Sequence, residues 1–180
     1  QFGLVGSEMC IRDRYLSLKY IYALSLLFFS FVSFMAFSTF KIDDNSFLTS
    51  TSYETQNFFG DFGSYYASFI FYTFGVLGYL VALFFFIYSV LVFLDKSPKY
   101  IFIKLILFFF SLILIPQAFY HFEITFSFID SIEAWGVFSS MLYKFYDLEY
   151  ISYLLSIFGV LIFFLSQNIL NFLKLPRIQI

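Results

Sequence analysis

Long uncharged runs alternate with short charged segments along the chain. Residues 20–40, 62–94 and 150–173 contain no charged side chain, and residues 100–120 contain only Lys104. A bilayer core about 30 Å thick requires about 20 apolar residues in a helix, because each backbone N–H and C=O must be paired inside the segment. The pattern therefore predicts four transmembrane helices, at about residues 18–40, 66–94, 100–120 and 150–173.

Between the third and fourth predicted spans the apolar residues follow a different pattern. They recur at three- and four-residue intervals, and the charged residues between them fall on other faces of the same helix. The apolar stripe consists of Phe128, Ile132, Trp135, Phe138, Leu142 and Phe145. Such a helix lies in the headgroup region and does not cross the bilayer. The predicted fold is thus an all-α integral membrane protein with four transmembrane helices and one interfacial amphipathic helix.

Composition excludes a soluble enzyme. Hydrophobic residues make up 61% of the chain, charged residues make up 12%, and the mean hydropathy is +0.87, whereas an ordinary soluble domain is about half apolar and about a quarter charged. None of the eight glycines is followed by Lys, as a phosphate-binding loop requires. The lone His121 and the lone Cys10 do not make a metal site. We therefore expect no catalytic, cofactor-binding or metal-binding residues in this chain.

The charges in the connections predict the topology, because short cytoplasmic loops carry an excess of Lys and Arg. Basic residues precede the first span and follow the second and the fourth: Lys19, Lys96, Lys99, Lys104, Lys174 and Arg177. The other two connections are acidic, with Asp43, Asp44, Glu54 and Asp61 in the first and Glu123, Asp130, Glu133, Asp147 and Glu149 in the second. Both ends of the chain are therefore predicted to lie in the cytoplasm, with two acidic loops outside.

Small residues form a row that leads from the first acidic loop into the second predicted span. The row consists of Gly60, Ser64, Ser68, Gly75, Gly78 and Ala82. Small residues let helix backbones approach closely in lipid. We therefore expect this face to be a packing surface, and the sequence leaves open whether its partner is another span or another subunit.

The two ends of the sequence are expected to lie outside the membrane domain. Residues 4–14, LVGSEMCIRDR, resemble the translation of a sequencing adapter, so residues 1–14 are predicted to be an artefact. Residues 15–173 then form the four-span domain. Residues 174–180 are expected to begin a cytoplasmic linker.

Residues 41–75, KIDDNSFLTSTSYETQNFFGDFGSYYASFIFYTFG, carry a more specific pattern. An Asp-rich stretch with a Ser-Phe pair follows the first span, and an Asn, two Gly, an Ala and a final Phe-Gly pair come after it. The positions are Asp43, Asn57, Gly60, Gly63, Ala67, Phe74 and Gly75. This pattern resembles the first outer loop and second span of the four-transmembrane N-terminal domain of the FtsK/SpoIIIE DNA translocases. The chain lacks that family's Pro after the first Asp and its Pro before the Asn, and it keeps only Gly136 of a Gly-richer second outer segment.

The resemblance implies a membrane anchor for an ATP-driven DNA pump that acts in cell division and chromosome segregation. Its motor would lie downstream of Ile180. This fragment would then bind no cofactor and contact no nucleic acid. Its implied partners are the bilayer of the bacterial inner membrane, membrane proteins of the division septum, and further copies that assemble as a hexamer through the motor.

Two other interpretations remain open from the residues alone. A small transporter or channel subunit unrelated to DNA would have the same spans and the same row of small residues, so only the loop pattern distinguishes it. An integral membrane enzyme is disfavoured because acids and histidines do not cluster. A G-x-x-x-x-G-K-[ST] motif downstream would favour the translocase, and a stop codon directly after Ile180 would favour the transporter or channel.

Overall fold

The regular structure of the described residues is entirely helical. The computed structural model describes residues 2–52, 54–96, 100–121, 136–145 and 149–167, and the side chains of these residues except 2–16, 120, 121 and 149. The elements are α1 (Phe2–Ser38), α2 (Gly60–Phe74), the 3-10 helix η1 (Gly75–Gly78), α3 (Tyr79–Phe93), α4 (Ile101–Leu114), α5 (Gln117–His121), α6 (Gly136–Phe145) and α7 (Glu149–Ser166).

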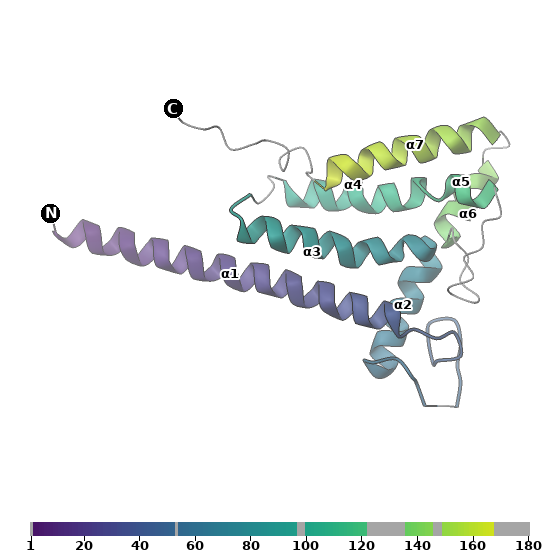
Figure 1. The fold of residues 1–180 in the computed structure, drawn as a ribbon, viewed down its shortest axis with the longest axis horizontal. Helices are drawn as coiled ribbons and strands as arrows, with labels where there is room; N and C mark the ends of the chain where they lie inside the picture. Colours follow the sequence, from purple (N-terminus) through teal and green to yellow (C-terminus); the bar gives the residue numbers. More distant parts are fainter. Residues whose placement is uncertain (1, 53, 97–99, 122–135, 146–148, 168–180) are drawn as a thin grey trace.

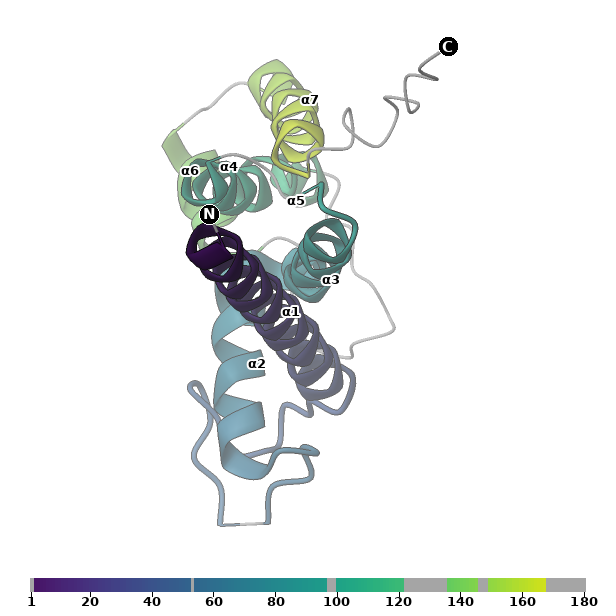
Figure 2. The same cartoon turned by 90° about the vertical axis from the view of Figure 1, so that its left-hand side faces the viewer.

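Four helices run side by side in alternating directions. In Figure 1, α1 and α4 run one way while α3 and α7 run the other, and Figure 2 shows the same bundle nearly end-on. The beginning of α1 and the end of α7 therefore lie at one end of the bundle, with the turn between α3 and α4. We call this the turn end. The opposite end carries residues 39–59, α2, α5 and α6, and we call it the loop end.

Three helical stretches in the described part of the chain are long and apolar enough to cross a membrane. They are Ser17–Ser38, Gly60–Phe93 and Ile101–Phe119. A fourth stretch, Tyr150–Ser166, is equally placed in the bundle and apolar but shorter. The predicted fourth span continues to residue 173, and its last six residues lie outside the described ones, as do residues 174–180 of the expected linker.

Helices α1 and α3 pack closely through small residues that recur every seven positions. Ser30 of α1 donates a hydrogen bond to the backbone oxygen of Ala82 (2.8 Å), and Ser89 of α3 donates one to the backbone oxygen of Ala23 (2.8 Å). Ala23, Ala82 and both serines are buried. At the turn end, Lys19 of α1 forms an ion pair with Asp95, which follows the end of α3. The seven-residue spacing brings matching positions to the shared face every two turns, so the two helices form one antiparallel pair.

Helices α4 and α7 form a second pair, and a layer of aromatic rings joins it to the first. Gly159 of α7 lies so close to α4 that an added Cβ would come within 2.8 Å of Leu114. Between the pairs, the ring of Phe84 stacks on that of Phe108 with centroids 4.3 Å apart. Tyr88 fills the same layer and donates its hydroxyl to the backbone oxygen of Ser166 (2.7 Å). Stacked rings of this kind stabilise contacts beyond their buried area.

The helix of the second predicted span is interrupted in the structure. Residues 66–94 do not form one helix, because α2 ends at Phe74 and η1 separates it from α3. Gly75 has φ 65° and ψ −152°, a backbone region that essentially only glycine occupies. As a result the chain turns there, and both Figure 1 and Figure 2 show α2 running across the direction of α3.

The described part of α1 begins well before the predicted artefact ends. Its backbone is helical from Phe2, and in Figure 1 its first turns extend beyond the other helices at the turn end. The side chains of residues 2–16 lie outside the described ones. The expectation that residues 1–14 lie outside the membrane domain therefore stays a prediction.

Candidate functional site at the loop end

Asn57 connects the first loop to the end of α1. Its side-chain amide donates a hydrogen bond to the backbone oxygen of Ala36 (2.8 Å), and its Oδ1 accepts one from the backbone N–H of Phe59 (3.1 Å). Asn57 is only 5% exposed. A buried amide with partners on two segments fixes their relative position, since leaving either partner unpaired costs free energy. Asn57 thus sets where the loop meets the first helix and where α2 begins.

Because Gly63 has no side chain, the amide of Asn57 can lie directly against its backbone. A Cβ at Gly63 would lie 2.0 Å from Oδ1 of Asn57 and 2.8 Å from the Cβ of Phe59. No heavy atom can stand that close, so any larger residue would displace the amide. Two residues selected from the sequence pattern, Asn57 and Gly63, are therefore brought into direct contact. Ala67, one turn further along α2, is fully buried on the same helix.

Of the two aspartates at the start of the first loop, the structure buries Asp44, whereas the sequence pattern selected Asp43. Asp43 is exposed, whereas Asp44 is 3% exposed and its Oδ1 accepts a hydrogen bond from the backbone N–H of Gln56 (2.8 Å). The backbone oxygen of Asp44 accepts a hydrogen bond from the hydroxyl of Thr49 (2.7 Å). These bonds hold the segments of the loop around Asp44, Thr49 and Gln56 together.

Two glycines from distant parts of the chain meet where α2 turns into α3. A Cβ at Gly136, the first residue of α6, would lie 2.6 Å from the backbone nitrogen of Gly75 and 2.6 Å from the backbone oxygen of Thr73. Gly136 itself has φ 67°. Phe74 is buried beside this contact, with its ring facing Phe109 of α4 (5.6 Å between centroids). The first residue of α6 therefore packs directly against the backbone of the turn at Gly75.

Pro116 interrupts the helix between α4 and α5, and serines from two other helices bind the backbone groups around it. Ser139 of α6 donates its hydroxyl to the backbone oxygen of Ile113 (2.7 Å). Ser156 of α7 donates to the backbone oxygen of Ile115 (2.7 Å) and accepts from the N–H of Ala118 (2.9 Å). Proline is tolerated in membrane helices when neighbouring Ser or Thr side chains satisfy the freed groups in this way.

The row of small residues finds its described partners within the chain. Ser68 accepts a hydrogen bond from the N–H of Phe47 (3.0 Å), Gly75 meets Gly136, and Ala82 meets Ser30. A Cβ at Gly78 would lie 2.6 Å from Ile70 of α2. Gly60 is the exception, because an added Cβ there would meet nothing within 4 Å. The row is thus a packing surface between elements of one chain, divided by the turn at Gly75.

Only the second half of the predicted amphipathic helix is described. The residues Phe128, Ile132 and Trp135 of its stripe lie outside the described ones. In α6, Phe138 and Phe145 are exposed, and the buried residues are Gly136 and Ser139. α6 therefore packs against the bundle with its small residues, while Phe145 is exposed and Phe138 is half-exposed with its ring near that of Phe74.

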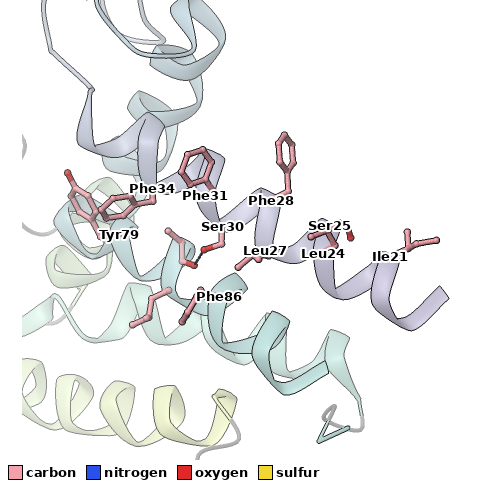
Figure 3. Close-up of a pocket in the computed structure, with 12 residues that line it drawn as sticks. Ile21, Leu24, Ser25, Leu27, Phe28, Ser30, Phe31, Phe34, Tyr79 and Phe86 are labelled. Atoms are coloured by element: carbon pink, nitrogen blue, oxygen red, sulfur yellow. Dashed lines mark hydrogen bonds between the residues drawn. The ribbon is translucent and has the colours of Figure 1, made fainter. Parts of the chain in front are cut away.

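A pocket on the flank shared by α1 and α3 is lined by uncharged side chains. Figure 3 shows Ser30 donating to α3 at its base, with Leu24, Phe28 and Phe34 along α1. Its volume is about 1090 Å³.

Among the described residues, no three His, Cys, Asp or Glu side chains gather as a metal site would require. The arrangement at the loop end holds helices in place, through the hydrogen bonds of Asn57, Ser139 and Ser156 to backbone groups of other segments.

The sequence interpretation missed serines that connect different helices, among them Ser30, Ser89, Ser139 and Ser156. A detectable signal existed for the first pair, because Ala23 and Ser30 have the same seven-residue spacing as Ala82 and Ser89. Ser30 lies opposite Ala82, and Ala23, seven residues earlier, lies opposite Ser89, seven residues later. This is the register of an antiparallel helix pair. Ser139 and Ser156 have no such signal, because their partners are carbonyls freed by a proline elsewhere in the chain.

Comparison with known proteins identifies the family of the chain. Residues 17–175 match the family described as the 4TM region of DNA translocase FtsK/SpoIIIE. No curated protein and no solved structure matches the chain. The match covers every described helix from the apolar part of α1 to the end of α7.

Proposed function

The chain belongs to the family of FtsK/SpoIIIE four-transmembrane regions, and we propose that it anchors a DNA translocase motor in the bacterial inner membrane at the division septum. The family match over residues 17–175 is the observation that carries this proposal. The matched region is a membrane anchor and not the ATPase motor. The alternative of a transporter or channel subunit rested on the spans alone, and the family match favours the translocase anchor over it.

The architecture supports an anchoring role. α1 and α3 are joined by reciprocal serine hydrogen bonds, and the aromatic layer around Phe84 and Phe108 joins them to α4 and α7. Buried hydrogen bonds between helices and fitted small-residue contacts restrict their relative movement. Such a bundle suits a part that must withstand the pull of a motor working against it.

The charge distribution supports an orientation with both ends in the cytoplasm. Lys19 and Lys96 lie at the turn end beside Asp95, whereas at the loop end Lys41 and Lys144 are outnumbered by Asp43, Asp44, Glu54 and Asp61. By the positive-inside rule the turn end faces the cytoplasm. A motor connected through residues 174–180 would then work on the side where DNA is.

A domain exchange tests the septal role. Residues 15–173, fused to a fluorescent protein, would replace the membrane domain of an FtsK-type translocase in a bacterium whose own copy is depleted. A four-span domain of an unrelated membrane protein, fused to the same motor, controls for anchoring alone. We expect a septal band and normal chromosome segregation only with the chain described here. Even distribution around the membrane, with insertion verified, would contradict the septal role.

A further inference from the structure

The position of α2 is not explained by a transmembrane role. Gly60–Phe93 contains 34 residues, which at about 1.5 Å per residue would reach about 50 Å as a straight helix, well beyond a hydrocarbon core of about 30 Å. The turn at Gly75 divides this length. α3 then runs with the bundle, and α2 lies across its loop end (Figure 1 and Figure 2).

The part of this stretch that follows Gly75 is long enough by itself to cross the bilayer. η1 has four residues and α3 has 15. A 3-10 helix rises about 2.0 Å per residue and an α-helix about 1.5 Å, so the two together span about 30 Å. This equals the thickness of the hydrocarbon core. The crossing therefore begins near Gly75, and α2 is left at the level where the core ends.

The two faces of α2 differ in the residues they carry. The buried face has small residues in its first half, Gly63, Ser64, Ala67 and Ser68, and then Ile70, Phe71, Thr73 and Phe74. The exposed face is aromatic: Phe62 is 74% exposed, Tyr65 44%, Phe69 49% and Tyr72 41%. At 3.6 residues per turn these four lie within an arc of about 80°.

Phe47 from the first loop extends the aromatic face of α2. Its ring centroid lies 6.0 Å from that of Phe69 and 6.2 Å from that of Tyr72, and it is itself 56% exposed. Contiguous apolar surface of this kind marks contact with a membrane or a partner. Because α2 lies at the end of a transmembrane bundle, the bilayer surface is necessarily beside it. Tyr, with a ring and a hydroxyl, is enriched at that level.

We propose that α2 is an interfacial helix and not part of the second span. The residues Phe62, Tyr65, Phe69 and Tyr72, with Phe47, rest in the boundary between headgroups and acyl chains at the loop end. The occupant of this face is thus lipid of the leaflet in which α1 ends and η1 begins. The inference rests on the fold and the membrane location and is independent of the septal role.

Depth-dependent fluorescence quenching tests the proposal. Trp135 is the single Trp of the chain, so Trp135→Phe provides a background for one new Trp at a time. Phe62→Trp, Phe69→Trp and Tyr72→Trp place the probe along α2. Leu83→Trp, an exposed position of α3, places it near the middle of the span. The chain is reconstituted in vesicles whose lipids carry bromine near the headgroup or near the chain end.

We expect quenching by the shallow bromines to exceed quenching by the deep ones at least twofold at all three α2 positions, with the reverse order at Leu83→Trp. Phe62 and Tyr72 are ten residues apart, or about 15 Å along a helix. A difference of that size in depth between Phe62→Trp and Tyr72→Trp would show that α2 crosses the membrane. Absence of quenching from either lipid at the α2 positions would show that protein or water covers this face. Either result overturns the proposal.

Discussion

Asn57 and Gly63 act as one unit, because the amide oxygen occupies the space that a Gly63 side chain would fill. We predict that Asn57→Ala lowers the free energy of unfolding by about 1–3 kcal/mol, since it leaves the Ala36 carbonyl and the Phe59 N–H unpaired. Denaturation by SDS titration in mixed micelles measures the change. Glu54→Ala, at an exposed loop position, is the control and should be nearly neutral.

A double-mutant cycle extends this prediction. Gly63→Ala should be destabilising in the wild-type background and less so with Asn57→Ala, because the substitution collides chiefly with the amide. Residues in contact show such coupling, whereas independent sites add. Strict additivity of the two substitutions would mean that the contact does not exist in the folded protein.

Gly136 and Gly60 offer a matched comparison at the same scale. Both have positive φ, 67° and 61°, but only Gly136 is surrounded by backbone atoms of another segment. Gly60→Ala should cost about 1–2 kcal/mol from its backbone conformation alone. Gly136→Ala should cost a further 1–3 kcal/mol or so, because the backbone at Gly75 must move away. If both substitutions lower the free energy of unfolding equally in SDS titration, the close contact between Gly136 and Gly75 is contradicted.

The choice of individual residues shows where sequence reasoning reaches its limit. The pattern selected Asp43 by resemblance and did not indicate that Asp44 is buried, because its burial depends on the contact between its carboxylate and the N–H of Gln56 across the loop. Gly63, Ala67 and Gly75 were selected by resemblance. A Cβ at Gly63 would collide with Asn57, Ala67 is fully buried, and Gly75 has a backbone conformation that essentially only glycine adopts. The pairing of Gly75 with Gly136 could not be read from the sequence, since 60 residues separate them.

At the scale of elements, the hydrogen bonds between α1 and α3 can be separated from bonds within one helix. Ser30→Ala and Ser89→Ala each remove an interhelical bond, and each should cost about 0.6 kcal/mol, with about 1.7 as an upper bound. Ser25→Ala is the control, because Ser25 donates to Tyr22 in its own helix. Förster transfer between labels on α1 and α3 measures the distance. A loosening after Ser25→Ala as large as after Ser30→Ala would contradict the assignment.

Long uncharged runs predicted an all-helical fold, which the described residues confirm, but they did not reveal where α2 turns. Hydropathy treats the Phe and Tyr residues of α2 like those of α3, so residues 62–94 read as one apolar segment. The turn depends on the backbone angles of Gly75 and on Gly136 packing against it. Pro116 was a visible interruption, but the serines that satisfy it come from α6 and α7.

For the whole molecule, the central claim is a chain that crosses the bilayer four times with both ends on one side. The bundle supports it, since α1 and α4 run opposite to α3 and α7 (Figure 1). The shorter described length of α7 is compatible with a crossing, because its 18 residues reach about 27 Å. The charges at the two ends of the bundle predict which side is the cytoplasm.

Accessibility of single cysteines to an impermeant thiol reagent is the most direct test of this claim. Cys10 is the single Cys of the chain, so Cys10→Ser gives a cysteine-free background. Ser50→Cys and Lys144→Cys lie at exposed positions of the two acidic connections, and Ser97→Cys lies in the basic one. We predict that reagent added outside intact spheroplasts labels the first two, and labels Ser97→Cys only after permeabilisation. Labelling of Ser97→Cys alone would invert the topology, and labelling of all three from outside would contradict the four crossings.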